Sequence, residues 1–358
     1  GTPTSPPSAA TPTVGTAVAS HAPSRATPDG TLVTNGPWLI YKKDQVLVVV
    51  DANGQGRNKQ PLPEGAVVGR LANAVSPDGG WLAFYTGSAQ RRTGTDQPEQ
   101  ADLALNLMDL TNGQTQSITN LLSVDYPDNF QQAAEILAVQ GVVAFQDLDL
   151  AVVPQFMQDA FLRGIEALDW SPDGRYLAFA GQMDGLSSDL YVYDVETQTI
   201  RRLSDGPEQI QSITWSPDGK WILHGSAHRC GLGLAINYHA AAVDGSTMKT
   251  LSSSVLDVWG WLSPSVYLQS DADNGPAGTH NLQSVDIDTE ALKTLWAGTF
   301  DAFAVDPQND LLAVVGAESV GGSDRALFFV DLSGSSVRDS GRDSGRRIRD
   351  RTGSVAFV

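Results

Sequence analysis

The sequence predicts an all-β protein made of repeated four-stranded units, and three observations lead to this prediction. Three stretches are near copies of one another, each an apolar strand, a Ser-Pro-Asp-Gly turn and an aromatic-rich strand: 74–84, 168–179 and 213–223. The turn proline recurs at Pro172, Pro217, Pro264 and Pro307, at spacings of 45, 47 and 43 residues. An aspartate closes an apolar run at six places: Asp51, Asp109, Asp194, Asp244, Asp286 and Asp331. A period near 45 with several short strands per unit is typical of a β-propeller, and six copies predict six blades.

The repeated turns have a chemistry that explains their composition. Proline sets φ for the turn, aspartate bonds the local backbone, and glycine takes a positive φ. These residues are therefore interpreted as structural: Ser76, Pro77, Asp78 and Gly79, then Ser171, Pro172, Asp173 and Gly174, then Ser216, Pro217, Asp218 and Gly219. Two degenerate copies are read at 262–264 and 305–307. The packing between blades is assigned to Trp81, Trp170, Trp215, Trp221, Phe84 and Phe179.

Both ends of the repeat region are consistent with a closed ring. Residues 38–41, 45–50 and 59–62 resemble the second, third and fourth strands of a blade that has no first strand. Residues 354–358 resemble a first strand with no blade after it. Joining the two completes the first blade from both termini and leaves no open sheet edge. The predicted propeller domain therefore covers 31–358.

Residues 123–164 interrupt the period. Asp128 suits a helix N-cap, Phe130 and Leu137 fall on one helical face, and Pro154 suits the first turn of a second helix. We expect a helical insertion between blades two and three. The alternative is a seventh, degenerate blade, because Pro77 and Pro172 are 95 residues apart, close to two repeats.

Residues 1–30 differ from the rest in composition, because they are mostly Pro, Thr, Ser and Ala. Such a segment cannot bury enough apolar surface to fold, which predicts a disordered linker. A Pro/Thr-rich tether suits an exported protein, so we expect an extracytoplasmic location with a lipid anchor upstream of Gly1, and contact with membranes only through that tether. The net charge of −18 argues against nucleic-acid binding.

The units that read Trp-Ser-Pro-Asp-Gly-Lys/Arg, followed by strands such as 189–194 and 200–203, resemble the TolB-type propeller repeat. The resemblance is strong over 165–252, clear over 70–118 and degenerate over 255–335. It implies a six-bladed propeller whose repeat residues are structural. Relatives of this kind include periplasmic partners of lipoproteins and the propeller halves of prolyl-oligopeptidase-type enzymes. The hydrolase halves need a Gly-x-Ser-x-Gly elbow, which does not occur here. No catalytic residue and no cofactor-binding residue is therefore predicted.

Two groups of residues could bind a metal ion. His224, His228, Cys230 and His239 gather in blade four and are suitable zinc or copper ligands, but their spacing matches no closed metal motif. Residues 271–276 begin like a calcium loop, yet Pro276 stands where the loop needs glycine. Packing histidines and an acidic turn are the preferred interpretations, so no metal or cofactor is predicted.

The predicted function is a non-catalytic scaffold for other cell-envelope proteins. Partners are expected on the face formed by the variable loops 87–100, 181–188, 226–232, 270–280 and 316–324, and on the insertion 123–164. Two alternatives stay open: a small-ligand or metal-binding sensor or enzyme that uses the central funnel, and a propeller subunit of a separately encoded peptidase. Residues 338–351 carry six Arg and three Asp, which suggests a solvated basic turn or a contact for an acidic surface.

Overall fold

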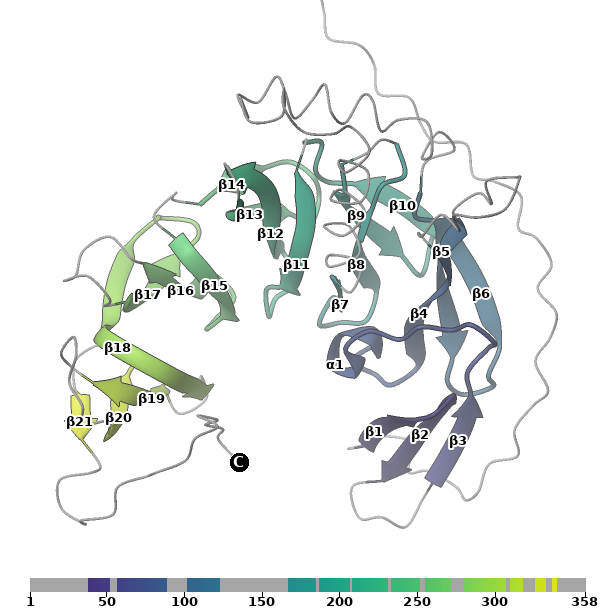
Figure 1. Cartoon of the computed structure of the whole chain (residues 1–358), viewed down its shortest axis with the longest axis horizontal. Helices are drawn as coiled ribbons and strands as arrows, with labels where there is room; N and C mark the ends of the chain where they lie inside the picture. The colour runs from purple at the N-terminus through teal and green to yellow at the C-terminus, as the bar shows by residue number, and fades with distance from the viewer. Residues whose placement is uncertain are drawn as a thin grey trace, which may run out of the picture.

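The computed structural model describes residues 38–51, 57–88, 102–122, 167–184, 187–206, 208–230, 233–251, 255–271, 280–306, 310–317, 326–332 and 337–339. Its sheets follow one another around an arc, and β7, β11 and β15 lie on the inner side of that arc (Figure 1). The fold is an all-β propeller, as predicted. The expected linker 1–30, the insertion 123–164 and the closing strand 354–358 lie outside the described residues.

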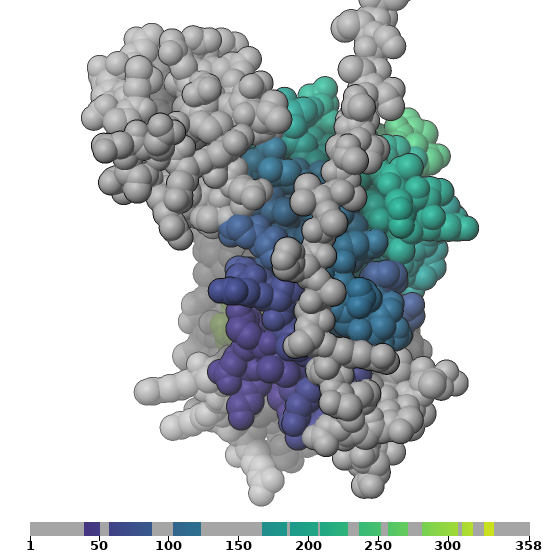
Figure 2. Space-filling view, turned by 90° about the vertical axis from the view of Figure 1, so that its right-hand side faces the viewer, coloured from purple at the N-terminus to yellow at the C-terminus, as the bar shows by residue number. Residues whose placement is uncertain are grey.

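The first two blades each contain a three-stranded antiparallel sheet. The first consists of β1 (Trp38–Lys43), β2 (Val46–Asp51) and β3 (Arg57–Pro61). The second consists of β4 (Trp81–Ser88), β5 (Asp102–Asp109) and β6 (Thr115–Asn120). The helical turn α1 (Leu71–Ala74) precedes the second sheet. In Figure 2 these two blades lie beside each other, in purple and blue, next to the teal blades that follow.

The prediction of a regular first strand in blade two is wrong. In its place are α1 and two isolated bridges, Val67 to Tyr85 and Val75 to Leu82. The amides of Asn73 and Ala74 bond the carbonyl oxygen of Arg70, so this short Leu- and Ala-containing segment coils instead of extending. Ala74 is nevertheless fully buried, and the turn therefore fills the place of the missing strand.

Blades three and four are complete four-stranded sheets. Blade three consists of β7 (Leu168–Trp170), β8 (Tyr176–Gly181), β9 (Asp189–Asp194) and β10 (Thr199–Arg202). Blade four consists of β11 (Gln209–Trp215), β12 (Trp221–Cys230), β13 (Gly233–Ala242) and β14 (Met248–Thr250). The loop expected over 226–232 is wrong in extent, because β12 and β13 pair as far as Cys230 and Gly233.

The remaining strands form one seven-stranded sheet that contains two blade-like halves. These strands are β15 (Val255–Trp261), β16 (Val266–Asp271), β17 (His280–Asp286), β18 (Leu292–Asp306), β19 (Leu311–Ala317), β20 (Ala326–Asp331) and β21 (Val337–Asp339). The long strand β18 pairs with β17 through its first part and with β19 through its second part. The described strands thus form six blade-like groups, and the total number of blades stays a prediction.

The turn chemistry explains why these hairpins close. Gly79, Gly174 and Gly219 all have φ near +70°, which glycine adopts without strain. In each turn the buried serine hydroxyl donates to the aspartate two residues later, over 2.5 to 2.8 Å, and accepts the amide of the residue five positions later. The turn at 262–266 is one residue shorter. The Leu262 amide donates to the carbonyl oxygen of Val266, four residues later, whereas the Ser216 amide donates to that of Trp221, five residues later. The blade repeat at 262–264 is therefore shifted by one residue, and Trp261 occupies the position of Trp215.

Adjacent blades are joined by a repeated tryptophan hydrogen bond. The indole N–H of Trp170 donates to the Ala74 carbonyl oxygen at 3.1 Å, and that of Trp215 donates to the Asp169 carbonyl oxygen at 2.9 Å. Trp261 repeats the contact with the Thr214 carbonyl oxygen at 3.4 Å. Each acceptor lies on the preceding blade, directly before the position that corresponds to the tryptophan. We call these three contacts the tryptophan latches.

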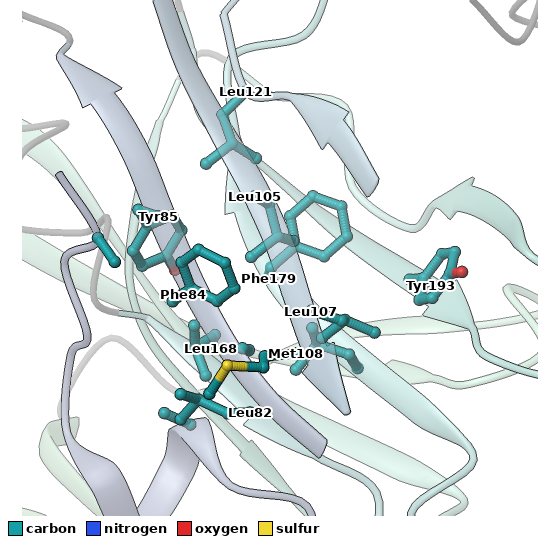
Figure 3. Close-up of a cluster of buried hydrophobic side chains, with 14 of the residues drawn as sticks. Leu82, Phe84, Tyr85, Leu105, Leu107, Met108, Leu121, Leu168, Phe179 and Tyr193 are labelled. Atoms are coloured by element: carbon teal, nitrogen blue, oxygen red, sulfur yellow. The ribbon is translucent and has the colours of Figure 1, made fainter. Parts of the chain in front are cut away.

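Apolar side chains fill the space between neighbouring sheets. Phe84 and Phe179 are almost fully buried, and they lie in one cluster with leucines of blades two and three (Figure 3). Burial of a large apolar side chain contributes roughly 1.5–3 kcal/mol. Trp170 and Trp215 are buried as predicted, whereas Trp81 and Trp221 are only partly buried. In the described part of the chain, no helix is long and apolar enough to cross a membrane.

Candidate functional site

His224 and His239 lie directly opposite each other on β12 and β13. Their rings stack with centroids 5.1 Å apart and planes inclined by 20°. The Nδ1 atom of His224 lies 3.3 Å from the Ser226 hydroxyl, whereas its Nε2 atom is buried with no hydrogen-bond partner among the described residues. His228 and Cys230, the other two candidates, belong to β12, but the structure does not describe their side chains. Of the four candidate ligands, the structure brings His224 and His239 together.

Electrostatics keep the buried imidazole neutral. Burial, helped by the neighbouring His239, lowers the pKa of His224 to about 3, against a smaller opposing effect of Glu208. His239 sits closer to the surface, where its Nε2 atom lies 3.3 Å from the Glu208 carboxylate and its Nδ1 atom 3.3 Å from the Thr250 hydroxyl. Among the described residues, no group of three or more His, Cys, Asp and Glu side chains is arranged to hold a metal ion.

The neutral His224 gives the fold a specific pH dependence. In the unfolded chain this imidazole takes up a proton near pH 6.5, whereas in the folded chain it stays neutral down to about pH 3. Stability is therefore lost as the pH falls below 6.5, by about 2 kcal/mol at pH 5. The variant His224→Phe keeps a ring against His239 but has no imidazole to protonate. Between pH 7 and pH 5, its free energy of unfolding, measured with urea, should fall by about 2 kcal/mol less than that of the wild type.

Comparing the pH dependence of stability in the wild type and in His224→Phe separates the effect of His224 from that of the buried carboxyl groups. Burial raises the pKa values of Asp169 and Asp189 to about 6, so these groups favour the folded state more strongly as the pH falls from about 6 to 3.8. Both proteins share that opposing contribution. Identical pH slopes in the wild type and His224→Phe would show that His224 is not buried in its neutral form.

A second feature, which the sequence analysis missed, lies on the inner strands of the last two blades. The ring of Trp259, on β15, packs edge-on against Phe303 at 5.1 Å and against Phe300 at 6.4 Å, both on β18. The two phenylalanines also pack edge to face, 5.8 Å apart. Trp259 remains 48% exposed, although its partners contact the buried core. We call Trp259, Phe300 and Phe303, together with the exposed Asp257 and Asp301, the inner-rim patch.

Irregular strand pairing produces this patch. Val258 pairs with Gln269 and Gly260 pairs with Leu268, so Trp259 is an extra residue in a β-bulge. Gly260 has φ +128° and supplies the backbone freedom. Asp301 is likewise the extra residue between Phe300 and Ala302. The only sequence signal was the Trp-Gly-Trp run at 259–261, in which the second tryptophan fits the repeat and the first does not.

Several known proteins are similar to this chain. Residues 197–230 match the WD domain, G-beta repeat family. The chain is similar to TolB from Acinetobacter baumannii, with 16% identity over 81% of this chain and 57% of that one, at a TM-score of 0.38. It is also similar to a putative TolB from Agrobacterium tumefaciens, with 19% identity over 76% of this chain and 81% of that one, at a TM-score of 0.40. No curated protein sequence matches the chain.

A prolyl endopeptidase structure gives a TM-score of 0.51. It is 12% identical, and the match covers 88% of this chain and 42% of the endopeptidase. At this identity the likeness concerns the fold alone, and the chain spans under half of the endopeptidase and 57% of the Acinetobacter protein. The sheet topology, the repeated turns and the WD-repeat match together identify the chain as a β-propeller with WD-like repeats.

Proposed function

We propose that this protein is a non-catalytic scaffold that binds other proteins of the cell envelope, outside the cytoplasm. The observation that carries the proposal is the exposure of Trp259 on top of two anchored phenylalanines. Tryptophan and other aromatic residues are enriched in the energetic centres of protein interfaces. A tryptophan that is half exposed in the isolated chain has apolar surface left for a partner to cover.

Several aspartates take part in holding the scaffold together. The carboxylate of Asp169 accepts the backbone amides of Trp170 and Trp215, so it joins blades three and four. The carboxylates of Asp109, Asp194, Asp244 and Asp286 accept turn amides of their own hairpins. These roles favour a scaffold over an enzyme. The envelope location rests on the composition of residues 1–30.

In-cell photo-crosslinking tests the proposal. A photoreactive phenylalanine analogue would be placed in turn at Trp259, Leu39 and Leu292, whose side chains are 48%, 61% and 53% exposed. We expect at least one position to give a discrete adduct with an envelope protein that mass spectrometry identifies. The purified pair should then bind each other in solution.

Two results would contradict this function. One is the absence of any adduct that can be reconstituted from purified proteins. The other is turnover of peptide or ester substrates by the purified chain, or its labelling by a fluorophosphonate serine-hydrolase probe. A hydrolase recovered as the crosslinked partner would instead identify the chain as a peptidase subunit, because the scaffold would then serve a separate enzyme.

A further inference from the structure

We propose that the inner-rim patch binds an arginine-bearing segment of a partner protein. This inference rests on the proposed function, because it names the chemistry of the partner for one surface of the scaffold. Three properties of the patch lead to it: a rigid aromatic platform, a backbone irregularity that exposes it, and carboxylates on the same two strands.

The platform is rigid because its two phenylalanines pack against the core. Phe300 and Phe303 pack against the buried cluster that contains Leu268, Leu312 and Val314. Trp259 stands edge-on to both rings, with interplanar angles of 75° and 88°. Edge-to-face contacts hold the indole in place, so little side-chain entropy is left to lose when a partner binds.

The exposure follows from the two bulges. A regular strand would alternate its side chains between the two faces of the sheet, whereas an extra residue re-aims a side chain and increases the local twist. Trp259 is an extra residue of β15, and Asp301 is an extra residue of β18. Two neighbouring inner strands thus each present an irregular, exposed residue at the same junction between blades.

The carboxylates of the inner-rim patch favour a positively charged partner. Asp257 and Asp301 are both exposed, and the Tyr238 hydroxyl donates to the Asp257 carboxylate at 3.2 Å, which fixes that side chain. The chain as a whole has a net charge of −18. A guanidinium group can stack on an indole ring and pair with a carboxylate at the same time, because it is planar and carries several donors. A lysine ammonium lacks that planar geometry.

Fluorine NMR of the full chain labelled with 5-fluorotryptophan tests the inference. The chain has eight tryptophans, and the spectrum of Trp259→Phe identifies the resonance of Trp259. The probes are the heptapeptide Gly-Ser-Arg-Leu-Arg-Ser-Gly and its counterparts with citrulline or lysine in place of arginine. We expect the arginine peptide to shift the Trp259 resonance selectively and the citrulline peptide to leave it unchanged. Asp301→Asn should lower the affinity for the arginine peptide about fivefold, whereas Leu292→Ala should leave that affinity unchanged.

Each other outcome overturns the inference. Equal shifts at several tryptophans would indicate attraction by net charge alone, and equal effects of the lysine peptide would remove the assignment to arginine. A Trp259 shift that depends on protein concentration without peptide would assign the patch to a second copy of this chain. If Trp259 stays unaffected while crosslinking finds a partner elsewhere, this inference fails and the proposed function stands.

Discussion

Replacing Trp215 with alanine is expected to lower the free energy of unfolding by about 3–5 kcal/mol, the usual cost of removing a buried tryptophan. Trp215 is 5% exposed, and its ring stacks on Tyr176 with the centroids 6.1 Å apart. Its indole N–H donates to the Asp169 carbonyl oxygen on the preceding blade. The alanine variant therefore loses packing between blades three and four and one of the tryptophan latches.

Conservative variants separate the two contributions. Trp215→Phe keeps an aromatic ring but leaves the Asp169 carbonyl oxygen without this donor, which should cost about 1–3 kcal/mol. Trp259→Ala is the matched control, because that ring is half exposed and makes no described latch, and it should change stability much less. Urea unfolding at pH 7 measures all three. A Trp215→Ala protein within 1 kcal/mol of the wild type would refute the latch.

Replacing Arg202 with alanine is expected to destabilise the protein by about 3 kcal/mol. The guanidinium contacts Asp184, Asp189 at 2.7 Å and Asp205 at 2.8 Å. The Asp189 side chain is only 2% exposed. Removal of one partner of a buried ion pair leaves an uncompensated charge, at about 3–5 kcal/mol. The lower value is expected because Ser204 and the Gly206 amide still donate to Asp189.

The pH dependence of this variant identifies the cause. Burial already raises the pKa of Asp189 to about 6, and loss of Arg202 should raise it further. The folded variant then takes up a proton above pH 6, so acidification toward pH 4 should restore part of its stability relative to the wild type. The double variant Arg202→Ala, Asp189→Asn should be more stable at pH 7 than Arg202→Ala alone. If neither acidification nor the Asp189→Asn substitution restores stability to Arg202→Ala, the loss of stability comes from packing and not from an unpaired Asp189 charge.

The repeat was predictable because neighbouring residues in the sequence determine the structure of each turn. A Ser-Pro-Asp-Gly turn determines its own φ angles and hydrogen bonds, so three copies at a fixed period predict three hairpins and a propeller. The structure adds what local chemistry leaves open. The tryptophans at 170, 215 and 261 were visible as packing residues or as a Trp-Gly-Trp run, but their acceptors lie 96, 46 and 47 residues away.

The errors and omissions have similar physical causes. The helical turn α1 replaces a strand because the bridges of Val67 and Val75 supply the pairing that a regular first strand would supply. The β12–β13 hairpin is longer than expected because tight turns and short loops have the same polar composition. Trp259 was missed because a bulge shifts one residue out of the alternation on which sequence patterns depend.

One measurement tests the central claim, which is that the latches maintain the scaffold and the inner-rim patch binds the partner. The free energy of unfolding and the affinity for the arginine heptapeptide would be determined on the same preparations of wild type, Trp215→Phe and Trp259→Ala. Trp215→Phe is expected to lose stability and keep affinity, whereas Trp259→Ala is expected to keep stability and lose affinity about fivefold. Parallel losses of stability and affinity in both variants would contradict it.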